Sequence, residues 1–257
     1  MMGQLSRKRR ILVLLGLLVL AVSGVLALPP IAQDPAYHLF ADSRSFFGIP
    51  NFNDVVSNIG FTLVGVLGLL LVIGEGSRML FAESVDARPY RIFFIAVALV
   101  GVGSAYYHWA PSNERLFWDR LPMAIAFMAI TSATVADRID ARAGNGWLLW
   151  LLLALGAASL IYWYWTESLG RGDLRLYALV QFYPMLAIPI MLVCFRSRCT
   201  HVQAYWWLLL LYIIAKLFEH FDGEVYNVLG FISGHLLKHL TAALGMYVLL
   251  VFYQKRD

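Results

Sequence analysis

Eight long apolar runs separated by short polar segments dominate this chain of 257 residues. A helix of about 20 apolar residues crosses the hydrocarbon layer of a membrane, and most of the runs approach that length. Inside lipid only helices and closed barrels satisfy every backbone hydrogen bond, so runs of this length predict helices. The runs are Ile11–Leu28, Asp54–Ile73, Tyr90–Trp109, Trp118–Ala136, Trp147–Trp165, Leu174–Phe195, Tyr205–Phe218 and Val228–Tyr253.

The composition excludes an ordinary soluble protein, because 60% of the residues are hydrophobic and only 14% are charged. The net charge of +4 does not indicate a nucleic-acid partner, since the basic residues lie between apolar runs rather than in one patch. Cys194 and Cys199 have no recognised metal or redox spacing, so no disulfide framework is implied. We therefore expect an all-α polytopic membrane protein.

The first apolar run follows the basic segment Arg7–Arg10, as in a signal peptide. Its apolar core is long for a signal peptide, which favours an uncleaved membrane anchor. We expect residues 1–28 to form this anchor or signal-like helix, residues 29–52 an extracytoplasmic loop, and residues 53–257 a seven-helix membrane domain. The expected fold is a seven-transmembrane-helix bundle plus one extra N-terminal hydrophobic helix.

The distribution of basic residues predicts the orientation in the membrane, because cytoplasmic loops are enriched in Lys and Arg. With both termini in the cytoplasm, the cytoplasmic side carries Arg7, Lys8, Arg9, Arg10, Arg78, Arg88, Arg91, Arg138, Arg142, Arg196, Arg198, Lys255 and Arg256. The outer side carries only Arg44, Arg115, Arg120, Arg171 and Arg175. We expect Trp109, Trp118, Trp163 and Trp165 to mark the outer membrane interface.

The last apolar run contains two histidines, His235 and His239, four residues apart. On a helix both imidazoles project from one face, with Cβ atoms about 5–6 Å apart. Two histidines in a membrane helix are costly unless they are bound, and zinc is the commonest metal for nitrogen ligands. The alternative is a pair of polar residues that hydrogen-bond between helices.

The predicted topology brings a third histidine and a carboxylate to a similar depth. His108 ends the third run on the outer side, Asp119 begins the fourth run there, and the last run enters from the same side. Three protein nitrogens and one open position are typical of a catalytic zinc site. Zinc lowers the pKa of its bound water from 15.7 to about 7. These residues predict a zinc-dependent active site toward the extracytoplasmic side.

Two more residues have candidate catalytic roles. Ser104 precedes His108 by one helical turn, so its hydroxyl can reach the zinc water or a developing oxyanion. Alternatively Ser104 is a small packing residue that bonds back to its own helix. Asp119 is the candidate base for the zinc-bound water. Alternatively it caps the following helix or pairs with Arg120 or Arg115.

Polar residues beside the last two runs have less specific interpretations. Glu219, His220, Asp222 and Glu224 are expected in a solvated turn. Glu219 or Asp222 is alternatively a hydrogen-bond partner of a zinc-ligating histidine. On a helix Lys238 points about 100° away from His239. It is expected to snorkel, to pair with Glu219 or Asp222, or to meet an anionic lipid headgroup.

The ordered set Ser104-x3-His108, Asp119 and His235-x3-His239 resembles the superfamily that contains the alkaline ceramidases and the adiponectin/progestin receptors. The resemblance implies a seven-helix zinc amidohydrolase fold. It also implies that His108, His235 and His239 hold the metal, that Asp119 manages protons and that Ser104 assists at the zinc water.

The segment Asn51–Asn58 resembles the entry to the first of seven conserved helices in the ceramidase branch. The chain departs from that branch in its extra N-terminal run and in its loop, which offers Asp42, Asn51, Asn53 and Asp54 instead of an acidic cluster with a tryptophan that supplies a calcium site. Calcium takes six to eight oxygen ligands, and these four residues do not make such a cluster.

The expected activity is zinc-dependent cleavage of the N-acyl amide of ceramide or a related lipid, giving a long-chain base and a fatty acid. Because a fold alone does not fix a substrate, this expectation depends on the resemblance. The alternative is a non-catalytic or receptor-like seven-helix membrane protein with a structural zinc site.

Overall fold

The computed structural model describes residues 6–74, 87–196 and 202–254, and in these ranges the chain forms helices and loops without a β-strand. The all-α fold predicted from the apolar runs is confirmed. The long helices are α1 (Arg7–Ala27), α3 (Ile59–Ile73), α5 (Arg88–Trp109), α6 (Asn113–Arg138), α8 (Trp147–Ser168), α9 (Arg175–Cys194), α10 (Gln203–His220) and α12 (Gly234–Gln254). The short helices are η2 (Pro35–His38), α2 (Phe52–Ser57), α7 (Ala141–Asn145) and α11 (Asp222–Leu229).

Six helical segments among the described residues are long and apolar enough to cross a membrane, or seven if the bent pair α10 and α11 is one span. The segment Phe52–Ile73 counts as one candidate span, although it consists of two consecutive helices, α2 and α3. Helix α6 is not in this set, and it carries Asp119 and Arg120 near one end and Asp137 and Arg138 at the other. A polytopic membrane protein is therefore supported, while the count of seven spans plus one stays a prediction.

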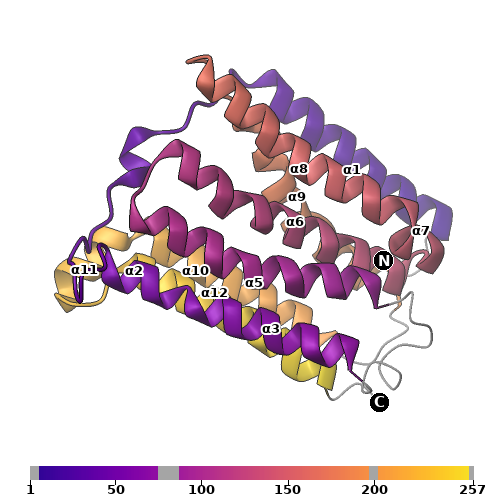
Figure 1. The fold of residues 1–257 in the computed structure, drawn as a ribbon. Coiled ribbons are helices and arrows are strands. Elements are labelled where there is room, and N and C mark those ends of the chain that lie inside the picture. The colour runs from indigo at the N-terminus through magenta and orange to yellow at the C-terminus, as the bar shows by residue number, and fades with distance from the viewer. Residues whose placement is uncertain (1–5, 75–86, 197–201, 255–257) are drawn as a thin grey trace.

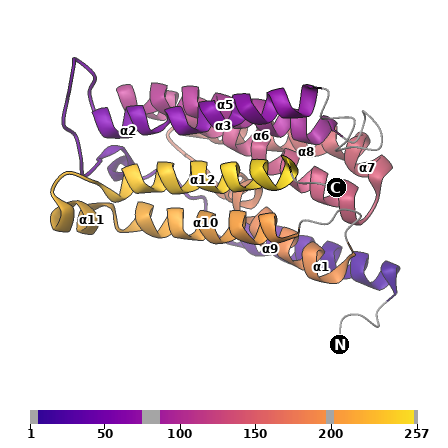
Figure 2. The ribbon, with the colours of Figure 1, turned by 90° about the horizontal axis from the view of Figure 1, so that it is seen from below.

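The long helices pack side by side in one bundle (Figure 1). Helix α5 packs against both α3 and α6, α6 packs against α8 and α9, and α10 pairs with α12. Helix α12 also contacts α3, so the last helix closes the bundle against the first part of the membrane domain. The start of α1 and the end of α12 lie at the same end of the bundle, opposite α2 and α11 (Figure 2).

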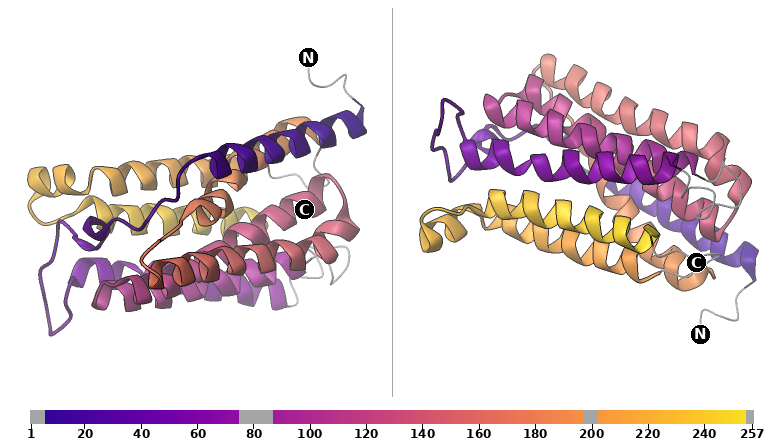
Figure 3. Two further views of the ribbon diagram at one scale, coloured as in Figure 1. Left: turned by 90° about the horizontal axis from the view of Figure 1, so that it is seen from above. Right: turned by 60° about the horizontal axis from the view of Figure 1, so that its bottom comes forward.

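Helix α1 lies at the periphery of the bundle, along α9 (Figure 3). Leu14 is its one buried residue among those described, and its carbonyl accepts a hydrogen bond of 3.1 Å from the Tyr183 hydroxyl. The Arg10 guanidinium donates to the carbonyl of Cys194 at the end of α9. This placement fits an extra hydrophobic helix added to a separate bundle.

Two glycines allow close helix contacts near one end of the bundle. A side chain at Gly103 would collide with the backbone carbonyl of Trp118, so glycine lets α5 approach α6 there. A side chain at Gly234 would collide with the backbone of Phe218 and Asp222, where α12 begins beside the end of α10. These contacts bring α5 close to α6 and the start of α12 close to the end of α10.

Candidate metal centre

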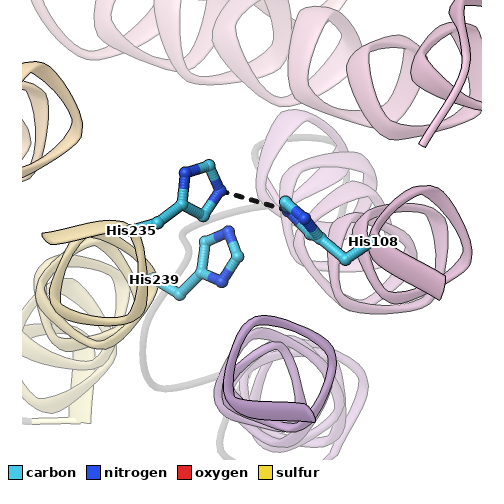
Figure 4. Close-up of side chains that lie close together, drawn as sticks. All are labelled: His108, His235 and His239. Atoms are coloured by element: carbon cyan, nitrogen blue, oxygen red, sulfur yellow. Dashed lines mark hydrogen bonds between the residues drawn. The ribbon is translucent and has the colours of Figure 1, made fainter. Parts of the chain in front are cut away.

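The three predicted histidines meet in the interior of the bundle. His108 lies in the last turn of α5, His235 in the first turn of α12, and His239 one turn later. Their side chains point toward one another (Figure 4), and they are only 1%, 5% and 2% exposed. One ligand nitrogen from each lies within 4.8 Å of the others. The predicted clustering of these residues is confirmed.

The spacing of the imidazoles suits a small divalent ion. The Nε2 atoms of His108 and His235 lie 3.2 Å apart. Two nitrogens bound at about 2.0–2.1 Å to a tetrahedral zinc ion lie about 3.3–3.4 Å apart. Imidazole donors suit zinc, copper, iron or nickel rather than calcium or magnesium. The three residues therefore fit a transition-metal ion, and zinc is one of several that they would accept.

A serine orients one of the imidazoles. The Ser57 hydroxyl donates to the carbonyl of Asp54 at 3.1 Å and lies 2.7 Å from Nδ1 of His239. Because its proton is used for Asp54, the hydroxyl accepts from Nδ1–H, which leaves Nε2 of His239 free for a metal. Ser57 belongs to the quoted segment Asn51–Asn58, but its contact with His239 was not predicted from the sequence.

His108 and His235 are held mainly through their backbones. The Asn51 amide donates to the carbonyl of His108 at 2.8 Å. The Asp222 carboxylate accepts from the backbone N–H of His235 at 2.7 Å and from that of Ala41 at 3.0 Å. Asp222 therefore fixes the start of α12, and the predicted hydrogen bond to a candidate metal-ligating histidine is confirmed, at the backbone of His235 rather than at its ring. Within the described residues, Nδ1 of His108 has no hydrogen-bond partner.

Glu219 joins two lysines beside the histidines. Its carboxylate forms ion pairs with Lys216 and, at 2.9 Å, with Lys238, and its side chain is 14% exposed. The expected solvated turn is therefore wrong for Glu219, which ends α10 inside the bundle, while the predicted pairing of Lys238 with Glu219 is confirmed. Lys238 Nζ also lies 3.1 Å from Nε2 of His235, because residues three apart on a helix share a face.

Ser104 and Asp119 meet where α5 and α6 are close. Both side chains are buried, on facing parts of the two helices. Asp119 lies in the second turn of α6, whose N-cap is Ser112, so the predicted capping alternative is wrong. Asp119 is not part of the metal-ligand group found among the described residues, but Asp119, Ser104 and His239 line the same cavity.

The rest of that cavity is largely apolar. It extends between helices α5, α6, α9, α10 and α12 and contacts α3 at one side chain. Its apolar lining includes Phe61, Val97, Ile130, Ile188, Leu208 and Met246. One connected space therefore combines a polar end that holds Ser104, Asp119 and His239 with walls suited to hydrocarbon.

The loop of residues 29–52 covers the histidines. The ring centroid of Phe40 lies 4.6 Å from that of His108 and 4.8 Å from that of His235. The Tyr37 hydroxyl donates to Glu219 at 3.2 Å, and the imidazole nitrogens of His38 lie 2.8 Å from the Tyr107 hydroxyl and 2.9 Å from Oδ1 of Asn113. No local sequence pattern predicts this cover, because it depends on tertiary contacts of a loop.

The loop carboxylate Asp42 is bound by protein donors. Arg44 donates to both of its oxygens at 2.8 Å, and the Asn53 amide donates at 2.8 Å. The Arg44 guanidinium holds the pKa of the Asp42 carboxyl below its usual value. In the part of the chain that the structure describes, the histidine group is the one cluster of three metal-ligating His, Cys, Asp or Glu side chains.

Comparisons with known proteins find no protein-family model and no curated protein that matches the chain.

Proposed function

We propose that the protein is a zinc-dependent membrane amidohydrolase that cleaves the N-acyl amide of ceramide or a related lipid to a long-chain base and a fatty acid. The supporting observation is the convergence of His108, His235 and His239 next to the cavity that holds Ser104 and Asp119. The order and spacing of these five residues resemble the alkaline ceramidases.

Each polar residue then has a distinct task. When bound by the three histidines, a zinc ion supplies Lewis-acid polarisation of the amide carbonyl and makes water acidic enough to attack near neutral pH. The Asp119 carboxylate accepts a proton from the attacking water and returns it to the leaving nitrogen, so the amide becomes an amine and a carboxylic acid. The Ser104 hydroxyl lines the same cavity as Asp119 and is available to the developing oxyanion.

The surroundings suit a lipid substrate. The apolar walls of the cavity accommodate an acyl chain, and the candidate membrane spans give a lipid direct access to the bundle. Phe40 covers two of the histidine rings, which limits the water that reaches them.

A receptor-like protein with a structural zinc site is the second candidate. It is favoured by Lys238, whose ammonium lies 3.1 Å from Nε2 of His235. A cation this close to a ligand nitrogen crowds the side of the metal that a hydrolase keeps open. Hydrolysis of a different acylated lipid is a further variant of the first proposal.

An activity assay separates the candidates. Purified protein loaded with zinc is incubated with ceramide labelled in its acyl chain, and released fatty acid is measured. We expect release that stops when a chelator removes the metal. A zinc-loaded protein that releases no fatty acid from ceramide or any other N-acyl lipid contradicts the hydrolase and favours the receptor-like candidate. Lipidomics of membranes with and without the active protein identifies the lipid that is consumed.

A further inference from the structure

Arg120 is an unusual residue for the interior of a membrane protein. It follows Asp119 on α6, is only 7% exposed, and lines the same cavity as Asp119, Ser104 and His239. Charged side chains inside membranes are rare and mark functional sites by default. The sequence predicted Arg120 on the outer side but did not indicate its burial, which requires an explanation.

Three aromatic rings surround the Arg120 guanidinium. Its central carbon lies 5.1 Å from the ring centroid of Tyr37, 5.0 Å from that of Trp163 and 5.1 Å from that of Tyr177. Trp163 is 0% exposed, so its predicted position at the membrane interface is wrong, and burial against the guanidinium is the reason. Ring faces attract the positive charge but are poor hydrogen-bond acceptors.

One guanidinium nitrogen has no acceptor. Nη1 of Arg120 is buried without a hydrogen-bond partner in the described part of the protein. An unsatisfied buried donor on a charged group is costly, and more so inside a membrane. A ligand in the cavity would supply the missing acceptor.

The charges around the cavity also favour an anion. Its charged lining consists of Asp119, Arg120, Lys216, Glu219 and Lys238, which are three cations and two carboxylates. The Glu219 carboxylate forms ion pairs with both lysines. No ion pair of Arg120 is recorded among the described residues, and a divalent ion at the histidines would add further positive charge.

We propose that Arg120 binds an oxyanion, a carboxylate or a phosphate, on the amine portion of the lipid substrate. This inference rests on the proposed function and, within the class of ceramide and related lipids, favours N-acyl lipids with an anionic head group over neutral ceramide. The guanidinium fork suits carboxylate and phosphate oxygens. Because Arg120 and Asp119 are neighbours on one helix, the anchored head group places the amide near Asp119 while the acyl chain follows the apolar walls.

A pair of matched ligands tests the assignment by binding alone. N-myristoylglycine and N-myristoylethanolamine share the acyl chain and the amide, and differ in a carboxylate against a hydroxymethyl group. Zinc-loaded protein in detergent is titrated with each by calorimetry at pH 7.5. We expect about tenfold or greater preference for N-myristoylglycine, as a charge-assisted hydrogen bond provides. In Arg120→Gln the preference should fall below about threefold, with the affinity for N-myristoylethanolamine unchanged.

Two further variants keep the test decisive. Arg115→Gln removes an arginine from the same helix that stacks on Tyr106 and does not line the cavity, so the preference should stay. Arg120→Lys keeps the charge but not the fork, and should give an intermediate preference even if Arg120→Gln fails to fold.

The outcomes for the two proposals are distinct. Equal affinity of the wild type for both ligands, absence of binding, or an unchanged preference in both Arg120 variants overturns the assignment to Arg120. In the last case the carboxylate is bound elsewhere, for example by the metal. If the preference follows Arg120 but neither ligand is ever hydrolysed, the binding site stands and the proposed hydrolase fails. If the protein hydrolyses both ligands and binds them with equal affinity, only the proposed selectivity for an anionic head group is overturned.

Discussion

The Nε2 atoms of His108 and His235 lie 3.2 Å apart, although 127 positions separate the two residues in the sequence. Such proximity of two buried imidazoles is maintained by helices α5 and α12, which carry them from different parts of the chain. One nitrogen of His239 lies within 4.8 Å of a nitrogen of each, as expected for three ligands of one ion. The metal content of the purified protein is therefore the most direct test of whether the three histidines bind an ion.

We expect purified protein to contain about one equivalent of transition metal, and His235→Ala to lose most of it, because two remaining imidazoles bind zinc far more weakly than three. Elemental analysis of both proteins measures the difference. His220→Ala is the matched control, since His220 is exposed at the end of α10 and is not in the histidine group. Equal metal content in the wild type and His235→Ala would remove His235 from the site.

Asp119→Asn should keep the metal and lose activity, because Asp119 lies outside the ligand group but lines the cavity. An amide has no carboxylate to accept a proton, so the rate of amide hydrolysis should fall by about 10²–10⁴-fold. Elemental analysis and release of labelled fatty acid are measured on the same sample. Asp140→Asn removes a helix-capping carboxylate at α7 and should leave both values unchanged. Activity retained by Asp119→Asn would exclude the proton-transfer role.

The parts of the site that the sequence predicted are those with a local or topological signal. His235 and His239 are four residues apart on one helix, and His108 was placed at the same depth by counting basic residues in loops. Ser104 was placed beside His108 by the same helical spacing. Each of these inferences needs only helix geometry and the sidedness of the chain.

The residues that were missed or misplaced depend on contacts between distant segments. Phe40 covers the histidines from a loop without regular periodicity, and Ser57 reaches His239 from another helix. Arg120 was assigned to the outer side and Trp163 to the outer interface, and the sequence did not indicate that the two side chains are buried against each other. Apolar periodicity does not predict which polar residues turn inward, because all-apolar membrane helices have no clear buried face.

Ser57→Ala should weaken metal binding. Its hydroxyl accepts from Nδ1 of His239 and fixes the orientation of that ring, and loss of such a partner typically costs about 10–100-fold in metal affinity. Competition with a fluorescent zinc chelator measures the dissociation constant. Ser159→Ala is the matched control, because Ser159 is also a buried helical serine but bonds only to the carbonyl of Gly156 among its described contacts. Unchanged affinity in Ser57→Ala would show that the hydroxyl has no role in the metal site.

Asp173 should make the stability of the bundle sensitive to acid. It lies between α8 and α9, outside the candidate spans, and its carboxylate accepts hydrogen bonds from Arg175 and, at 3.0 Å, from Tyr162. The Arg175 guanidinium lowers the pKa of Asp173 to about 2, despite the opposing effect of burial. The same guanidinium donates to the carbonyls of Leu26 and Leu28, so this ion pair also holds the end of α1.

The sign of the pH effect follows from the lowered pKa. An unfolded aspartate has a pKa of about 3.9, so the unfolded state takes up a proton first as the pH falls. The stabilisation is therefore complete well above about pH 4, about half remains at pH 3, and it is lost as the pH falls through about 2. Thermal unfolding of wild type and Asp173→Asn in detergent should show a gap in midpoint at pH 7 that is clearly smaller at pH 3. For Asp34→Asn, a matched change at the N-cap of η2, the difference in midpoint from the wild type should show no comparable decrease between pH 7 and pH 3. A gap between wild type and Asp173→Asn that stays constant or widens in acid would contradict the stabilising ion pair with Arg175.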